Sequence, residues 1–194
     1  MALASVYVDA KTSVFWDVED FPIPFGDSYH ETIRSALEKN GYVGEVSILA
    51  YGDKKPDNNL DDGITFIRKS DKHVRLNRML FDIRVWANQR FFKSPYYNLL
   101  LIAKNITQTT QIERVLREAC VGREINVLVV LPDDVQEAEA PPAHSVWSSW
   151  KSLIDGEKPI DPQPPRYGKL EPSRIVDKDI YSYVPRWEIT PCFR

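Results

Sequence analysis

The chain has little cysteine, no long apolar run and no excess of positive charge, and each absence excludes a class of protein. Its two cysteines, Cys120 and Cys192, lie far apart, which excludes a disulfide framework and a zinc finger. No apolar run approaches the ~18 residues of a membrane span, and the amino terminus lacks the basic region of a secretory signal. A net charge of −3 excludes the strong basic field typical of duplex DNA binding. We therefore expect a soluble, intracellular, cytoplasmic protein without membrane insertion.

Short apolar runs rich in β-branched residues alternate with helical patterns, as in parallel βαβ units. Five strands are predicted, over Thr12–Asp17, Glu45–Tyr51, Ile64–Arg68, Asn98–Ala103 and Asn126–Leu131. The chain length fits one domain of about 150 residues with a tail. We predict a three-layer α/β domain over 11–156 with a mainly parallel five-stranded sheet, and a proline-rich tail over 157–194.

Helical periodicity predicts four helices between and after these strands. They are expected between Ser28 and Gly41, from near His73 to Arg90, from Thr110 onward, and within Ala143–Ile154. Ser28 and Glu31 match a capping box at the start of the first helix. In the second helix, Asp82 falls on the rim of the apolar stripe, where a helix can present an acid to a cleft. Trp147 and Trp150 are interpreted as packing residues rather than as base-stacking ones.

Three carboxylates, Asp17, Glu19 and Asp20, follow the first predicted strand directly. The crevice outside the carboxyl ends of strands is where ligands bind in open α/β sheets. Clustered carboxylates repel one another unless a cation or a proton joins them, and hard divalent metals are the usual cations. The sequence therefore predicts a candidate site at the end of this strand.

A basic stretch lies where the second long helix begins. Its members are Arg68, Lys69, Lys72, His73, Arg75 and Arg78, interrupted by Asp71. As a charge run alone, the stretch has the simple interpretation of a solvated helix start. Beside an acidic cleft it becomes a candidate for holding RNA phosphates, with Lys104 helping from a neighbouring loop. Both interpretations stay open at this point.

The segment Phe-Trp-Asp-Val-Glu-Asp-Phe-Pro-Ile-Pro, which begins at Phe15, resembles the opening motif of NYN domains, which have the PIN-like ribonuclease fold. The resemblance is to the limkain-b type, found in plants and in the meiosis regulator and mRNA stability factor. Residues 72–83, 98–107 and 143–156 resemble later stretches of that family in the same order. The resemblance covers roughly residues 11–156 and implies a PIN-like α/β fold.

The resemblance also implies a metal site for RNA cleavage with Mg²⁺ or Mn²⁺, in which carboxylates hold the cation. Asp17 and Asp82 match two acids of the family and are the candidate catalytic residues. Asp20 stands where the family commonly has asparagine, and its carboxylate could reach the cation through water. Metal ions suit this chemistry because they activate water and neutralise charge on phosphate oxygens.

The fourth-strand motif departs from the family. Where acids are usual, this chain has Asn105 and Thr107, and Lys104 adds a positive charge. A close charge at a partly buried site is worth a few kcal/mol, and every 1.36 kcal/mol is about tenfold in rate. We therefore expect cleavage to be reduced by several powers of ten. The carbonyl of Asn105 could still ligate a hard cation weakly, together with Asp17, Asp20 and Asp82.

These observations predict an RNA-associated protein in the regulation of gene expression, with a degenerate ribonuclease site and single-stranded RNA and proteins as partners. The alternatives are an active Mg²⁺- or Mn²⁺-dependent endoribonuclease and a protein-interaction scaffold that binds no RNA. A dehalogenase-type phosphatase is disfavoured, because Asp17 and Glu19 do not form its Asp-x-Asp pair. A peroxisomal association is implied by the family resemblance alone, since the chain shows no peroxisomal address.

Overall fold

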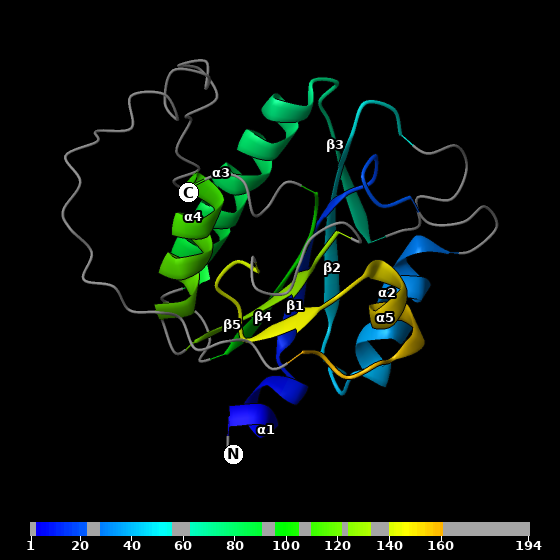
Figure 1. The fold of residues 1–194 in the computed structure, drawn as a ribbon, viewed down its shortest axis with the longest axis vertical. Coiled ribbons are helices and arrows are strands. Elements are labelled where there is room, and N and C mark those ends of the chain that lie inside the picture. Colours follow the sequence, from blue (N-terminus) through cyan, green and yellow to red (C-terminus); the bar gives the residue numbers. More distant parts are fainter. Residues whose placement is uncertain are drawn as a thin grey trace, which may run out of the picture.

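The structure is a computed structural model, shown as a ribbon in Figure 1. It describes residues 3–22, 28–55, 63–90, 96–104, 110–121, 124–132 and 140–160. Of the tail predicted over 157–194, residues 161–194 lie outside the described residues. In the described part, the predicted α/β architecture is confirmed, because a parallel sheet carries helices on both of its faces. This three-layer arrangement is consistent with the expected PIN-like fold.

One sheet of six parallel strands forms the middle layer, in the order β3-β2-β1-β4-β5-β6. The strands are β1 (Lys11–Asp17), β2 (Val46–Gly52), β3 (Ile64–Arg68), β4 (Tyr97–Ile102), β5 (Ile125–Val130) and β6 (Ser145–Trp147). The five predicted strands are present with nearly the predicted bounds. The predicted strand number is wrong by one, because β6 was not expected.

The strand order reverses direction at the middle of the sheet. The chain adds β2 and β3 outward from β1, and then returns to place β4 on the other side of β1. In doubly wound sheets, a crevice opens at such a reversal, outside the carboxyl ends of the two central strands. Here the two central strands are β1, which ends at Asp17, and β4, which ends at Ile102.

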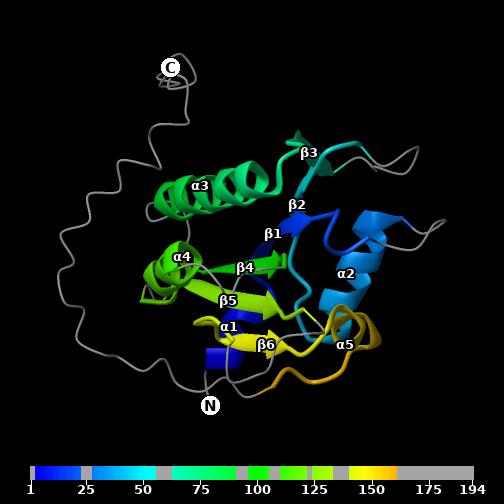
Figure 2. The same cartoon turned by 45° about the horizontal axis from the view of Figure 1, so that its top comes forward.

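Helices form the two outer layers, as Figure 2 shows. Their bounds are α1 (Leu3–Val8), α2 (Tyr29–Lys39), α3 (Lys72–Arg90), α4 (Thr110–Val121) and α5 (Trp150–Asp155). Helices α3 and α4 cover one face of the sheet, and α2 and α5 cover the other. Helix α1, which the sequence pattern did not predict, precedes β1.

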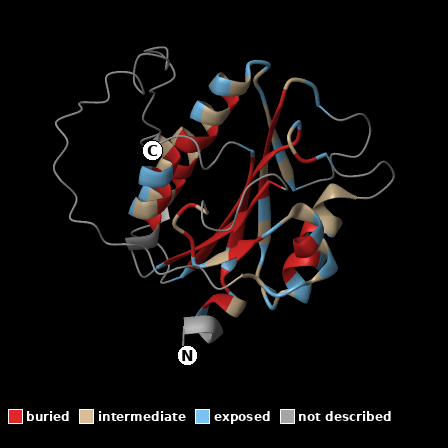
Figure 3. Cartoon of the chain, viewed as in Figure 1, coloured by how far each residue is buried: buried red, intermediate tan, exposed pale blue. Residues whose placement is uncertain are grey.

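Alternate strand residues supply two separate apolar cores, one under each pair of helices. In β1, Phe15 packs toward α3 and α4, whereas Val14 and Trp16 pack toward α2 and α5. Strands β4 and β5 are buried at every position, as expected for central strands of a parallel sheet that is covered on both faces. The buried strands form the centre of the molecule in Figure 3.

The helix predicted over Ala143–Ile154 is partly wrong. Residues Ser145–Trp147 form β6, which pairs in parallel with β5, and only Trp150–Asp155 is helical. Ser149 ends the extended stretch, because its hydroxyl accepts a hydrogen bond from the backbone N–H of Ser152 in a capping box. As predicted, Trp147 is a packing residue: its ring is buried in the core beneath α2 and α5.

The described residues contain no helix with the length and apolar character needed to cross a membrane.

Candidate functional site

The turn after β1 is held in one conformation by hydrogen bonds. The buried indole N–H of Trp16 donates to the carbonyl of Phe21 over 2.9 Å. The backbone N–H of Phe21 donates to the carbonyl of Asp17, and the N–H of Glu19 donates to the Asp17 carboxylate. These hydrogen bonds therefore fix the positions of the three residues whose carboxylates were predicted to form a site.

Glycine at position 52 permits a close approach between this turn and β2. A Cβ atom there would lie 2.7 Å from a Cγ2 of Val18 and 3.1 Å from Oε1 of Glu19. Oε1 of Glu19 also accepts a hydrogen bond from the backbone N–H of Asp53, which follows β2. Glu19 thus joins the ends of β1 and β2, a contact that the sequence pattern did not reveal.

Asp17 forms a buried ion pair with Arg75 of α3. Nε of Arg75 lies 3.0 Å from Oδ2 of Asp17, and the two side chains are 6% and 3% exposed. Nη1 of Arg75 donates to the carbonyl of Ser70 and, at longer range, to that of Lys69. Arg75 was predicted to bind RNA. The structure places it inside the fold as the counter-ion of Asp17.

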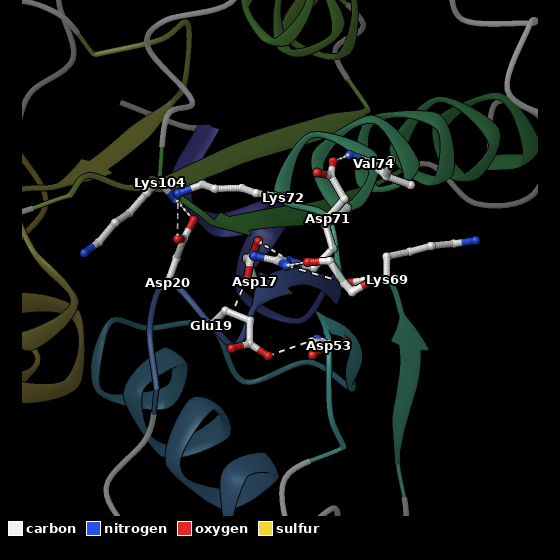
Figure 4. A network of polar contacts seen from close by, with 11 residues as sticks. Asp17, Glu19, Asp20, Asp53, Lys69, Asp71, Lys72, Val74 and Lys104 are labelled. Carbon is white, nitrogen blue, oxygen red and sulfur yellow. Dashed lines mark hydrogen bonds and ion pairs between the residues drawn. The ribbon is translucent and has the colours of Figure 1, made fainter.

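Asp20 joins the turn after β1 to helix α3 and to the backbone beyond β4. Its Oδ1 lies 2.9 Å from Nζ of Lys72, and its Oδ2 accepts a hydrogen bond of 3.0 Å from the backbone N–H of Lys104. Figure 4 shows these contacts among the labelled residues of the network. One carboxylate oxygen of Asp20 therefore binds the first residue of α3, and the other accepts a hydrogen bond from the backbone beyond β4.

Asp82 also has cationic and polar partners from its own chain. Nε of Arg78, one turn earlier in α3, lies 2.9 Å from its Oδ2, and the hydroxyl of Tyr51 in β2 donates to it over 2.9 Å. The side chain of Asp82 is 13% exposed, as expected for the predicted position on the rim of the helix face. Tyr51 is the register partner of Asp17 in the β1–β2 ladder, so it links the two acidic positions.

Burial perturbs the ionisation of two groups at this end of the sheet. Desolvation raises the pKa of Asp17 above its ordinary value, and the nearby charge of Asp20 raises it further, whereas the hydrogen bond and the charge of Arg75 lower it. Desolvation also raises the pKa of Tyr51, with the neighbouring Asp82 as the next cause. Tyr51 therefore remains a protonated hydrogen-bond donor at neutral pH.

The metal site expected from Asp17, Asp20, Asp82 and Asn105 stays a prediction. Among the residues that the structure describes, no three His, Cys, Asp or Glu side chains form a group that could hold a metal ion. Asn105 and Thr107 lie outside the described residues. Each of the three described acids pairs with a cationic side chain of its own chain.

The basic residues predicted to bind RNA fall into two sets. Lys72, Arg75 and Arg78 pair with the three acids. Lys69 and Lys104 extend their side chains away from the acids in Figure 4. Nζ of Lys104 lies 5.8 Å from the centre of the Phe21 ring. Arg68 is exposed, and its Nε donates to the carbonyl of Asp53.

Part of this pairing had a signal in the sequence. Arg78 and Asp82 are four residues apart, and side chains at this spacing are neighbours on a helix. The partners of Asp17 and Asp20 have no such local signal, because they come from a helix far along the chain.

In comparisons with known proteins, neither a family model nor a curated protein matches the chain.

Proposed function

We propose that this chain is an RNA-associated protein of the NYN type, which acts in the regulation of gene expression by binding single-stranded RNA. Its ribonuclease-like site binds without cleaving. The site of action is intracellular, and a cytoplasmic or peroxisomal location rests on the family resemblance alone. Protein partners belong to the same proposal.

One observation carries the proposal: Asp17, Asp20 and Asp82 are each bound by a cation of the same chain. A metal ion at these carboxylates would compete with Arg75, Lys72 and Arg78 for their oxygens. The pair of Asp17 with Arg75 is buried, and removing one partner of a buried pair costs about 3–5 kcal/mol, because the other charge stays buried without compensation. The arrangement supports a site in which side-chain cations, rather than a metal ion, neutralise the carboxylates.

The residual cations support binding to RNA at the same edge of the sheet. Lys69 follows β3, and Lys104 follows β4 on the other side of β1. Lys104 is exposed and Lys69 is partly exposed, and lysines of this kind hold phosphate oxygens and fix the position of a strand without reading its bases. A strand of RNA that crosses the ends of β3, β2, β1 and β4 would meet both lysines.

The test measures cleavage and binding of a labelled single-stranded RNA in the same samples, with Mg²⁺, Mn²⁺ or EDTA. The protein is compared with Asp17→Asn, Asp82→Asn and the control Glu118→Gln, which changes an exposed acid of α4. We expect no cleavage in any sample and binding that does not need metal. Metal-dependent cleavage that both aspartate variants lose and Glu118→Gln keeps would establish the active endoribonuclease instead.

A second arm locates the binding surface. Lys69→Gln and Lys104→Gln should each reduce the slope of log affinity against log salt by about 0.7, because each removes one phosphate contact. The matched control is Lys11→Gln, at the amino end of β1 and hence at the opposite edge of the sheet. Equal behaviour of all three variants would refute an RNA interface at this edge, and absence of RNA binding would leave the scaffold alternative.

A further inference from the structure

We infer that Asp20 occupies an anion-binding position of its own chain, and that a phosphate group takes its place when RNA binds. The position is formed by the ammonium group of Lys72 and the backbone N–H of Lys104. This inference rests on the proposed RNA binding for the source of the phosphate. In the absence of RNA, the carboxylate of Asp20 occupies the two donors, and RNA phosphate must compete with it for them.

The contacts of Asp20 are those that a phosphate group would make. Each carboxylate oxygen accepts from a different donor, Lys72 at 2.9 Å and the N–H of Lys104 at 3.0 Å. Ammonium groups and backbone N–H groups are common donors to phosphate oxygens, and hydrogen bonds with an ionised partner are the stronger kind. A phosphate group offers more acceptor oxygens than a carboxylate, so it can satisfy both donors at once.

The position also lies where the topology favours a ligand. It joins the turn after β1 to the end of β4, at the reversal of strand order, where doubly wound sheets bind ligands. Lys104 is only two residues beyond the end of β4, and Lys72 is the first residue of α3. Both donors therefore belong to residues at or close to the ends of regular elements.

Of the three acids, Asp20 has the contacts that open most readily. The pair of Asp17 with Arg75 is buried, and Asp82 is held by Tyr51 as well as by Arg78. In the pair of Asp20 with Lys72, the lysine side chain is 42% exposed and that of Asp20 is 10% exposed, so water screens this pair more than the pair of Asp17 with Arg75. Asp17 lies close enough to Asp20 for their charges to repel, which further favours release of Asp20.

The inference predicts that loss of an acid strengthens binding. Asp20→Asn should bind single-stranded RNA about tenfold more tightly, because Lys72 is released for a charge-assisted phosphate contact. The matched control is Glu19→Gln, which removes one negative charge from the same turn and keeps an oxygen that can accept from the N–H of Asp53. The control should gain no more than about threefold, the effect of one exposed charge.

A double-variant cycle assigns the gain to Lys72. In the unaltered protein, Lys72→Gln should weaken RNA binding less than in the Asp20→Asn background, because there a phosphate group gains this lysine only by displacing Asp20. In the Asp20→Asn background, the same change should abolish the gain and reduce the slope of log affinity against log salt by about 0.7. Equal effects of Lys72→Gln in the two backgrounds would overturn the inference.

A probe without RNA separates this inference from the proposed function. Inorganic phosphate is titrated into ¹⁵N-labelled protein, and the amide signal of Lys104 is followed in the unaltered chain, in Asp20→Ala and in Glu19→Gln. A saturable shift in Asp20→Ala alone supports the anion position, even if no sample binds RNA and the proposed function fails. RNA binding with no shift in Asp20→Ala, and equal affinity gains for Asp20→Asn and Glu19→Gln, would overturn the inference and leave the proposed function standing. No response to either probe would overturn both.

Discussion

The guanidinium group of Arg75 lies 3.0 Å from the carboxylate of Asp17, and both side chains are withdrawn from solvent. The same guanidinium binds the carbonyl of Ser70 over 2.9 Å. A single arginine therefore ties the end of β1 to helix α3 and to the turn that precedes this helix. It also fixes the position of Lys69 and Lys72, which lie one residue before and two residues after Ser70 and belong to the proposed RNA surface.

Replacement of Arg75 tests the strength of this connection. Arg75→Met should lower the free energy of unfolding at pH 7 by about 3–5 kcal/mol, because Asp17 keeps a buried charge without a partner. At pH 4 the loss should be smaller, since burial raises the pKa of Asp17 and protonation removes the unpaired charge. Urea unfolding at the two pH values measures both effects.

The double variant Asp17→Asn/Arg75→Met is the control for this pair. With both charges removed, much of the lost stability should return, as found when buried ion pairs are replaced by neutral groups. If the double variant is as unstable as the sum of the two single variants, then Asp17 and Arg75 do not act as a pair.

His144 makes the stability of the β5–β6 edge dependent on pH. Its Nδ1 accepts a hydrogen bond of 2.9 Å from the backbone N–H of Val127, which only an unprotonated Nδ1 can do. Burial lowers the pKa of His144 below its ordinary value of 6.5. The unfolded chain thus binds the proton more readily, so the free energy of unfolding should fall as the pH drops below 6.5.

Unfolding in urea between pH 5 and pH 7.5 checks this dependence. His144→Leu should be less stable at pH 7.5 by about 1–2 kcal/mol, since the N–H of Val127 loses its acceptor. This variant should also lack the part of the pH dependence that belongs to His144. His73→Gln, which changes an exposed histidine of α3, should keep it. A pH profile that is identical in His144→Leu and the unaltered protein would contradict the assignment.

Asn98 anchors the segment before β1 to the centre of the sheet. Its buried amide group donates to the carbonyls of Tyr7 and Ala10, and its oxygen accepts from Asn126 over 2.9 Å. Asn98→Leu should cost at least about 1–3 kcal/mol, because these buried groups lose their partners. Chemical denaturation measures the loss.

Hydrogen exchange shows where the Asn98 variant loosens. The amide of Val43, which donates to the carbonyl of Val8, should exchange faster in Asn98→Leu, since the segment that contains Val8 is no longer held. The control Asn88→Leu, on the exposed surface of α3, should change stability by no more than about 0.5 kcal/mol and leave this amide protected.

The sequence correctly predicted features that depend on neighbouring residues, but it did not predict the short strand β6. The start of α2 was predicted correctly, because Ser28 caps the helix through a hydrogen bond from Glu31, three residues away. In contrast, Ser145–Trp147 was predicted as helix. The spacing of its apolar residues fits a helix, but the segment pairs with β5 and is a strand. In this strand, Val146 and Trp147 face opposite cores. Three residues carry too little pattern to outweigh such a contact.

The sequence by itself determined the α/β class, strands β1 to β5 and the acidic turn after β1, since all of these depend on neighbours within a few positions. Only the tertiary structure decided what the acids do. Arg75 and Lys72 lie 58 and 52 residues along the chain from Asp17 and Asp20, so no local pattern could pair them. The strand order brings α3 against the end of β1, and electrostatic attraction, strongest for the buried pair of Asp17 with Arg75, then selects these partners.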